Sequence, residues 1–235
     1  MLVISPHLDD AVLSCGCLLA SHPGSTVLTV FAGTPPDAQR LTAWDERCGF
    51  GSAEEAVAAR RREDLAALAM MGASAQWLDF CDGQYGCTPV LDELAVTLEA
   101  ALLELLPDVV LYPLGLHHAD HLLVHDATAV ALRALSGAIA LAYEDVPYRA
   151  MHGELQQRLS ALASSGLCAT PARLHADAAQ PLKSRALQAY ASQVRAMSAD
   201  ELDDAALPER CWRLEPQVNA RRGDVQRPHQ PLLTR

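Results

Sequence analysis

Clusters of basic residues are scarce in this chain of 235 residues. Lysine and arginine total 18 against 29 aspartates and glutamates, which gives a formal net charge of −11. A surface that follows a phosphate backbone needs clustered cations. The one basic triplet, at residues 60–62, has acidic neighbours on both sides and is interpreted as a solvated helix face. The sequence therefore argues against nucleic acid as a partner.

Long hydrophobic runs and paired cysteines are also missing. No stretch of about 18 apolar residues is free of charges and breakers, so we expect no membrane span. The chain opens directly into an apolar strand pattern, and no signal peptide is expected. Seven scattered cysteines do not suggest a disulfide framework and favour the cytoplasm. Cys15 and Cys17 have no second cysteine pair to complete a tetrahedral metal site, and we interpret them as small buried helix residues.

Short runs of apolar and β-branched residues alternate with helix-like stretches along the first 150 residues. We predict strands at 2–5, 26–31, 76–80, 108–112 and 138–143, and helices ending near 19 and covering 53–71, 89–106 and 120–135. This alternation predicts an α/β domain, with a Rossmann-like, mostly parallel sheet and helices on both faces. Ligands bind outside the carboxyl ends of the strands in such sheets. The polar loop at 34–53 is expected to lie over the site.

The pattern weakens after residue 150. Residues 180–197 look helical, and 198–235 are expected to be only partly regular. We predict one domain over 1–235, with a Rossmann-like core at 1–150 and a C-terminal portion at 151–235 that completes the fold.

Two clusters of histidine and aspartate follow predicted strands, about 110 residues apart. The first contains His7, Asp9 and Asp10, and the second contains His117, His118, Asp120 and His121. Imidazoles and carboxylates from two strand ends can supply three ligands to a metal ion, an open coordination position, a base and an acid. The pair of clusters predicts a metal site at the C-terminal ends of the strands.

Each cluster also has a plainer interpretation. Asp9 or Asp10 can cap the following helix, although capping explains one carboxylate and leaves the other and His7 unexplained. The second cluster can be a helix start that happens to be rich in histidine. His125 lies four residues after His121, but a zincin motif requires glutamate after the first histidine and Leu122 stands there. We therefore expect His125 to pack or to support the site, and His117 to face the rim of the pocket.

The segments SPHLDDAVLSCG at 5–16 and LGLHHADHLLVHDA at 114–127 resemble the two signature motifs of the PIG-L/LmbE-like de-N-acetylase family. Weaker matches occur at 57–73, 78–85 and 183–193, so the resemblance spans residues 1 to about 195. Members of this family are metal-dependent enzymes that remove acetyl from N-acetylglucosamine-type groups. The resemblance implies a zinc enzyme, with ferrous iron or another divalent ion as the alternative, acting on a small N-acetylated sugar.

The family motifs imply a role for each matching residue. His7, Asp10 and His121 would be the metal ligands, and Asp9 would be the general base. His118 would protonate the leaving amine or steady the oxyanion, with Asp120 tuning it. Arg60 and, more weakly, Asp82 would bind substrate hydroxyls. For these two the plainer interpretations are a solvated or paired arginine beside Glu63 or Asp64, and an Asp-Gly turn.

Three departures from the family pattern occur near the clusters. Ala11 stands where a glutamate is usual, and Leu8 and Ala119 each replace a proline. None of these changes removes an implied ligand, base or acid.

Two alternatives to a sugar N-deacetylase stay open. One is a metal-dependent amidase acting on a non-sugar amide, such as a thiol conjugate or a natural product. The other is a non-catalytic Rossmann-like binding module, although no Gly-x-Gly-x-x-Gly turn or P-loop follows any strand. A Gly-x-Ser-x-Gly hydrolase motif is also missing. The specific substrate and the oligomeric state, including a homo-oligomer, are left open by the sequence.

Overall fold

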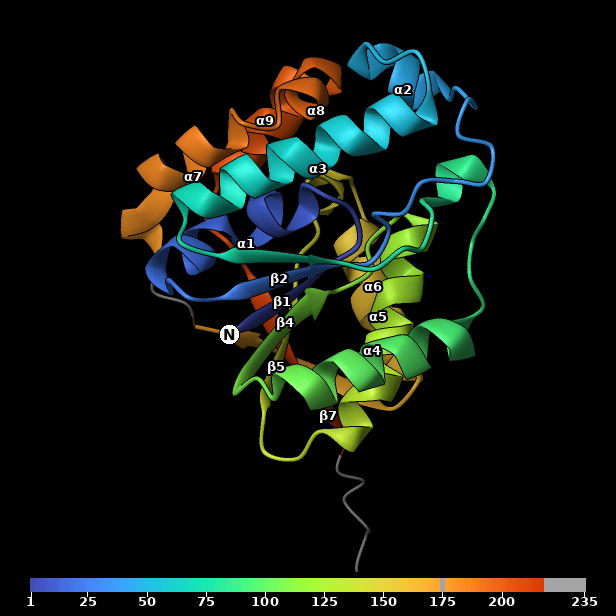
Figure 1. Ribbon diagram of the computed structural model, residues 1–235. Helices are drawn as coiled ribbons and strands as arrows, with labels where there is room; N and C mark the ends of the chain where they lie inside the picture. Colours follow the sequence, from blue (N-terminus) through green and yellow to red (C-terminus); the bar gives the residue numbers. More distant parts are fainter. Residues whose placement is uncertain (174–175, 218–235) are drawn as a thin grey trace, which may run out of the picture.

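The computed structural model describes residues 1–173 and 176–217, and a seven-stranded sheet runs through the centre of the molecule (Figure 1). Its strand order is β3-β2-β1-β4-β5-β7-β6. The first five strands are all parallel. They are β1 (Leu2–Ser5), β2 (Thr26–Thr29), β3 (Ser74–Trp77), β4 (Val109–Pro113) and β5 (Ile139–Tyr143). From β1 the chain builds first toward β3 and later toward β5, so the sheet has a topological switch point between β1 and β4.

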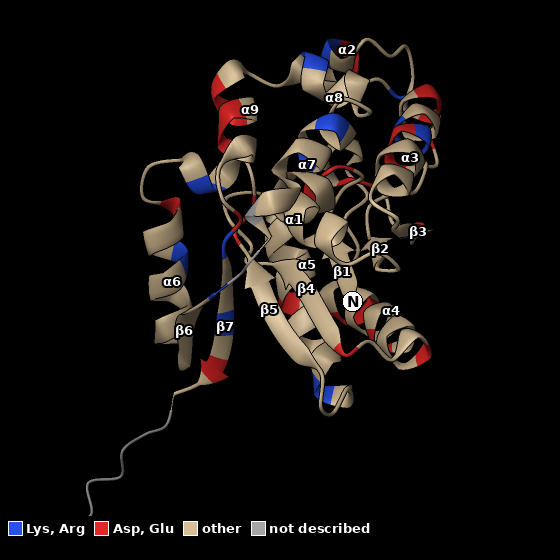
Figure 2. Cartoon of the chain, turned by 90° about the vertical axis from the view of Figure 1, so that its left-hand side faces the viewer, with Lys and Arg blue, Asp and Glu red and all other residues tan. Residues whose placement is uncertain are grey.

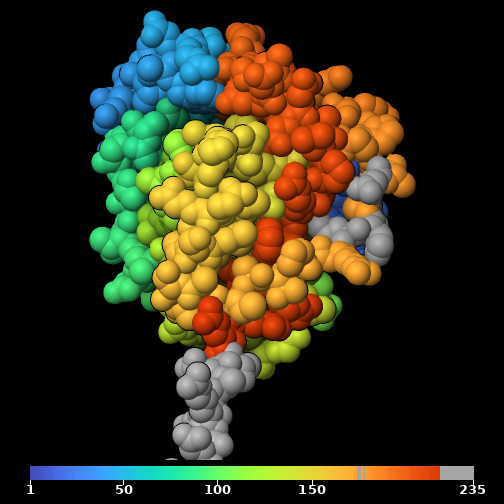
Figure 3. All heavy atoms as spheres, turned by 180° about the vertical axis from the view of Figure 1, so that it is seen from behind, coloured from blue at the N-terminus to red at the C-terminus, as the bar shows by residue number. Residues whose placement is uncertain are grey.

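Two antiparallel strands from the last third of the chain extend this sheet. β7 (Cys211–Pro216) pairs with β5, and β6 (Leu167–Ala172) forms the edge beyond it. Figure 3 shows the orange and red final third packed along the full height of the yellow segment that precedes it. The predicted mostly parallel sheet is confirmed, and the antiparallel pair comes from the region where the sequence pattern was weak.

Helices cover both faces of the sheet, as predicted. One face carries α1 (Asp10–Ser21), α3 (Ala53–Met70) and α7 (Gln180–Leu187), and the other carries α4 (Leu91–Leu105), α5 (Ala119–Ala131) and α6 (Glu154–Ser164). Successive strand residues point to opposite faces. Val3 and Val27 therefore join the core beneath α1 and α3, whereas Ile4 and Leu28 join the core beneath α4 and α5. Burial of each such side chain stabilises the fold by about 1.5–3 kcal/mol.

Several predicted elements differ in extent from the observed ones. The helical stretch 180–197 is two helices, α7 and α8 (Ala191–Ala196), and α9 (Ala199–Ala206) follows. The loop 34–53 contains a short helix, α2 (Ala43–Cys48), which Thr42 caps by accepting a 3.1 Å hydrogen bond from the Asp45 amide. The predicted strand 76–80 lies at Ser74–Trp77 instead.

Helix α1 is kinked next to the first cluster. Cys15 has φ −133° and ψ 17°, which interrupts the helical hydrogen bonding. The amides of Cys17 and Leu18 donate instead to the two carboxylate oxygens of Glu209, at 2.7 and 3.0 Å, and Lys183 Nζ pairs with the same carboxylate at 2.9 Å. Cys15 and Cys17 are buried, as predicted. The kink ties the C-terminal part of the chain to the helix that carries the site.

Charged residues show no continuous basic tract in Figure 2. Blue segments are scattered, and on α3 they alternate with red ones. Within residues 1–173 and 176–217, no helix combines the length and apolar character needed to cross a bilayer.

Candidate metal and active site

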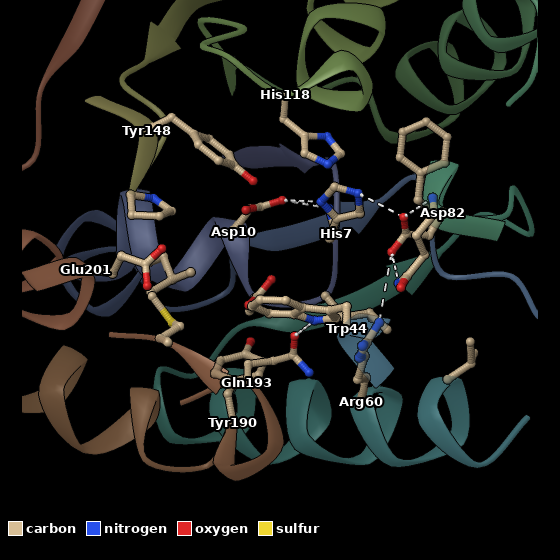
Figure 4. A pocket seen from close by; sticks show the side chains of 18 of the residues that line it. His7, Asp10, Trp44, Arg60, Asp82, His118, Tyr148, Tyr190, Gln193 and Glu201 are labelled. Atoms are coloured by element: carbon tan, nitrogen blue, oxygen red, sulfur yellow. Dashed lines mark hydrogen bonds and ion pairs between the residues drawn. The ribbon is translucent and has the colours of Figure 1, made fainter. Parts of the chain in front are cut away.

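Neighbouring parallel strands bring the two sequence clusters together. β1 pairs with β4 in a register that places Leu2 opposite Val110 and Val3 opposite Leu111. The chain leaves both strands at the same edge of the sheet, where the first cluster follows β1 and the second follows β4. Figure 4 shows the result: His7 and Asp10 point into a pocket beneath His118.

The carboxylate of Asp10 is the centre of the cluster. Its Oδ2 accepts a 2.8 Å hydrogen bond from the His7 amide and lies 3.1 Å from His7 Nδ1 and 3.2 Å from His121 Nε2. Burial alone would raise the pKa of Asp10, but His121 and His7 outweigh burial and hold it well below its usual range. Asp9 occupies the N-cap position of α1, yet neither aspartate side chain caps the helix. The capping interpretation is wrong, because Asp10 bonds back to His7.

The ring of His121 is oriented by a carboxylate to which the sequence analysis assigned no role. Its Nδ1 lies 2.7 Å from Oδ1 of Asp145, and both residues are essentially inaccessible to solvent. Burial lowers the pKa of His121, but Asp10 and Asp145 raise it to about 9. Nε2 faces Asp10 and makes no hydrogen bond of acceptable geometry, so a buried ring nitrogen is left without one. Such a nitrogen, flanked by carboxylates, fits a cation ligand.

Within the part of the chain that the structure describes, two overlapping groups of side chains have the spacing of metal ligands. They are His7, Asp10 and His121, and His7, His118 and Asp120, with ligand atoms within 4.8 Å of one another in each group. In the second group, Asp120 Oδ2 already accepts a 2.9 Å bond from the Gly83 amide, and His118 Nδ1 accepts one from the Asp120 amide at 3.2 Å. The unbonded Nε2 of His121 favours the first group, which is also the one that the family motifs imply.

Asp9 lines the pocket beside these groups without joining either of them. The carboxylate of Asp9 accepts no hydrogen bond from any of the described residues. Burial first, and then the charge of Asp10, raise the pKa of Asp9 to about 7, against smaller opposing effects of His7 and Arg60. A carboxylate in this position can exchange a proton near neutral pH.

His118 is the N-cap of α5 and lines the same pocket. Because Nδ1 accepts the Asp120 amide bond, the neutral ring carries its proton on Nε2. Burial lowers the pKa of His118, and the neighbouring His7 and His121 lower it further. A lowered pKa makes the protonated ring a stronger acid.

The hydrogen-bond partners of the Asp120 carboxylate are His7 and Gly83 rather than His118. Its Oδ2 lies 3.0 Å from His7 Nε2 and accepts the Gly83 amide bond instead. Burial tends to raise the pKa of Asp120, yet the bond and charge of His7 hold it below its usual value. Asp120 thus joins the second cluster to the first and to the 83–85 turn.

Arg60 and Asp82 lie together at the far side of the pocket. Arg60 is buried and forms a 2.7 Å ion pair with Asp45 of α2, and its Nη1 lies 3.9 Å from Asp82. The prediction of a solvated helix face is wrong for this member of the triplet, and its partner is Asp45 rather than Glu63 or Asp64. Asp82 Oδ1 accepts a 3.0 Å bond from the Gln84 amide, as expected for an Asx turn, and lies 3.8 Å from His7 Nε2.

The two other histidines of the second region lie outside this group. His125 is buried and its Nδ1 donates to the Pro113 carbonyl at 2.8 Å, in agreement with a packing role. His117 has a side chain that is 46% exposed, and it lines a second cavity adjoining the first.

The pocket itself has a volume of about 360 Å³ and a largely apolar wall that the sequence analysis did not identify. The loop 34–53 does reach it: Trp44 lines the wall and donates to Gln193 Oε1 at 3.0 Å. These lining residues are scattered along the chain from Leu13 to Glu201, and no local motif marks them. They include Leu13, Phe31, Trp44, Val57, Tyr85, Tyr148, Tyr190, Gln193, Met197 and Glu201.

A comparison with known protein families matches the part of the chain that contains both clusters. Residues 2–132 match the family model described as GlcNAc-PI de-N-acetylase, PIG-L. A curated relative, 2'-N-acetylparomamine deacetylase of Streptomyces fradiae, is 33% identical over 167 residues, covering 63% of this chain and 57% of that protein. The chain therefore matches little more than half the length of this relative.

Solved structures match over nearly the whole chain. The A40926 pseudoaglycone deacetylase Dbv21 has a TM-score of 0.71 at 29% identity, covering 92% of this chain and 97% of that one. A triple mutant of a deacetylase from the teicoplanin pathway has a TM-score of 0.72 at 28% identity, covering 93% and 99%. The 4-carboxy-2-hydroxymuconate hydratase GalB shares the fold at 19% identity, with a TM-score of 0.57 and coverage of 99% and 98%. The same fold thus also occurs in a protein that carries out a different kind of reaction.

Proposed function

Because the chain belongs to the GlcNAc-PI de-N-acetylase (PIG-L) family, we propose that it is a metal-dependent hydrolase that removes an N-acetyl group from an amino-sugar substrate. The observation that carries the proposal is the convergence of His7, Asp10 and His121, next to a pocket that Asp9 and His118 also line. The structurally similar hydratase has the same fold, but the fold alone is no argument for this reaction. We also propose that the described chain acts as one catalytic domain, located in the cytoplasm.

His7, Asp10 and His121 would hold the ion. A divalent cation placed there would act as a Lewis acid and lower the pKa of water toward neutrality. Zinc is our proposal for the ion and ferrous iron the alternative, because two imidazoles and a carboxylate suit both.

Asp9 and His118 divide the proton transfers between them. Asp9 takes a proton from the attacking water as the new C–O bond forms. Burial, and after it the charge of Asp10, raise the pKa of Asp9 to about 7, which suits that task. His118, once protonated, gives its Nε2 proton to the amide nitrogen as the C–N bond breaks. Amine and acetate are the products, and the proton taken by Asp9 returns His118 to its protonated form.

Arg60 and Asp82 would contact the sugar. Both line the pocket that the substrate must fill once its amide reaches the carboxylates. Asp45 holds the guanidinium in place, so Arg60 can offer its remaining N–H groups without a large loss of side-chain freedom.

Release of amine from a panel of acetylated compounds tests the proposal. The panel contains N-acetylglucosamine, 2'-N-acetylparomamine and N-acetylcysteine, each incubated with zinc-loaded and ferrous protein. Turnover of either sugar, and none of N-acetylcysteine, supports the sugar deacetylase. Turnover of N-acetylcysteine alone replaces it with the non-sugar amidase. Sugar binding without turnover under either metal would leave a binding module and contradict catalysis.

A further inference from the structure

The hydroxyl of Tyr148 has no established task in the site. Tyr148 begins the short 3-10 turn Tyr148–Ala150 that follows β5, outside both sequence clusters. Figure 4 shows its side chain reaching into the pocket, with the hydroxyl directed toward the space between His118 and Asp10. No hydrogen bond to this oxygen is made by residues 1–173 or 176–217. A polar group therefore points, without a partner, at the place where a substrate amide would bind.

Three histidine rings fix the position of the Tyr148 ring. It stacks on His118 with centroids 5.9 Å apart, meets His121 edge-on at 5.1 Å and packs against His117 at 5.5 Å. A ring held on several sides loses little freedom when its hydroxyl meets a ligand. Pre-organised donors of this kind are the most effective ones for charge that develops in a transition state.

Amide hydrolysis at this site changes two substrate atoms at once. The acyl oxygen gains negative charge when water adds, and the nitrogen needs a proton before the C–N bond breaks. His118 has one proton directed at the pocket, on Nε2, because its Nδ1 accepts the Asp120 amide. One imidazole N–H group cannot bond to the oxygen and protonate the nitrogen in the same step, so the oxygen can use a second donor beside any bound ion.

We propose that the Tyr148 hydroxyl donates a hydrogen bond to the acyl oxygen of the bound amide as that oxygen becomes negative. The inference rests on the proposed deacetylase function and assigns His118 to the nitrogen alone. Tyr148 keeps its proton throughout: it stabilises the tetrahedral oxygen, and the proton that reaches nitrogen comes from His118. It acts as a catalytic residue, because it touches the reacting carbonyl oxygen.

A different role for Tyr148 is also consistent with its position. The residue lines the second cavity as well, of about 370 Å³, together with His117 and Met151, so its ring could serve as a platform for the rest of the sugar. A platform contributes through the ring, whereas the proposed role requires the oxygen. Substitution by phenylalanine separates the two, because it keeps the ring and removes the hydroxyl.

The experiment compares Tyr148→Phe with wild type and with Tyr112→Phe. Tyr112 is a buried tyrosine of β4 that lies outside the pocket, with its ring centroid 5.4 Å from that of His125. Its variant therefore controls for the loss of a buried tyrosine hydroxyl. All three proteins are measured for metal content, thermal midpoint, and kcat and KM on the sugar that wild type turns over best. Affinity for a methylphosphonamidate analogue of that sugar, which mimics the tetrahedral state, is the second measurement.

For Tyr148→Phe we expect kcat to fall by about 10²–10³-fold, as for loss of one oxyanion donor, with KM and metal content near wild type. Affinity for the analogue should fall by a similar factor, because only the tetrahedral state needs this donor. Tyr112→Phe should keep kcat. A Tyr148→Phe kcat close to wild type, or a loss confined to KM, overturns the inference while the deacetylase stands. No sugar turnover by wild type overturns the proposed function and this inference with it.

Discussion

The carboxylate of Asp145 lies 2.7 Å from Nδ1 of His121, and its second oxygen accepts the amides of Gly115 and Leu116 at 2.9 and 3.0 Å. One buried side chain thus fixes the His121 ring and also the start of the loop that carries His118. Nδ1 holds the proton in this pair, which leaves Nε2 aimed at Asp10 as a ligand atom.

Asp145→Asn should weaken metal binding by about 10–100-fold, the usual effect of losing a carboxylate that orients a ligating histidine. The measurement is the dissociation constant for zinc, by competition with a chromophoric chelator. Glu144→Gln is the matched control, because Glu144 is a buried neighbour that accepts from Trp212 Nε1 instead of touching His121. Equal zinc affinity in wild type and Asp145→Asn would show that Asp145 only supports the fold.

His121→Ala and His118→Ala separate the two groups of potential metal ligands. If His7, Asp10 and His121 bind the ion, His121→Ala should lose metal, whereas His118→Ala should keep close to one ion per chain and lose turnover. Elemental analysis of the dialysed proteins gives the ratio directly. Metal loss in His118→Ala with retention in His121→Ala would instead place the ion with Asp120.

Asp45→Asn should destabilise the protein. Asp45 is fully buried and accepts from Arg60 at 2.7 Å and from the Tyr85 hydroxyl at 2.9 Å. Removal of its charge leaves the Arg60 guanidinium buried without its partner, at a cost of about 3–5 kcal/mol. Urea denaturation measures the change in the free energy of unfolding, and the exposed Asp37→Asn serves as control. A loss below about 1 kcal/mol would mean that Arg60 does not depend on this pair.

Acid should stabilise the fold through Asp64. Burial raises the pKa of this carboxyl to about 6, although Trp77 and Tyr190 donate to it. In the unfolded chain the pKa is near 3.8, so the folded state binds the proton more tightly between pH 4 and 6. The resulting stabilisation is complete below about pH 4, is lost as the pH rises through 6, and amounts to at most about 3 kcal/mol.

The measurement is the free energy of unfolding of wild type minus that of Asp64→Asn, followed from pH 4 to 7. An amide can still accept from one donor, and the Tyr190 hydroxyl can turn to accept from the amide. The difference should shrink steadily as the pH rises. A difference that does not vary with pH would refute the raised pKa.

The parallel half of the fold was readable from the sequence because its strands are continuous apolar runs. The observed bounds of β1 are the predicted ones, and β4 and β5 differ by one residue, since buried parallel strands need apolar side chains on both faces. β6 and β7 were missed. They contain Pro171, Arg213 and Glu215, and their pattern is that of half-exposed antiparallel strands.

The candidate site was likewise predictable only in part. Its chemical residues lie in two short motifs, and the adjacency of β1 and β4 brings those motifs together. Asp145 follows β5 with no neighbouring histidine in the sequence. Tyr148 lies in a 3-10 turn and Trp44 in the short helix α2, and tertiary packing sets the place of both. Local patterns cannot indicate such residues, because their partners are 24 or more positions away for Asp145 and 149 for Trp44.

The most direct test of the central claim compares wild type and Asp9→Asn, purified side by side and loaded with zinc or, without oxygen, with ferrous iron. Metal content and amine release are measured on the same samples. The account predicts about one ion per chain in both proteins, with turnover lower in Asp9→Asn by at least the roughly 10²-fold that loss of a general base brings. Near-normal turnover by Asp9→Asn, or no bound metal in wild type after loading, would contradict it.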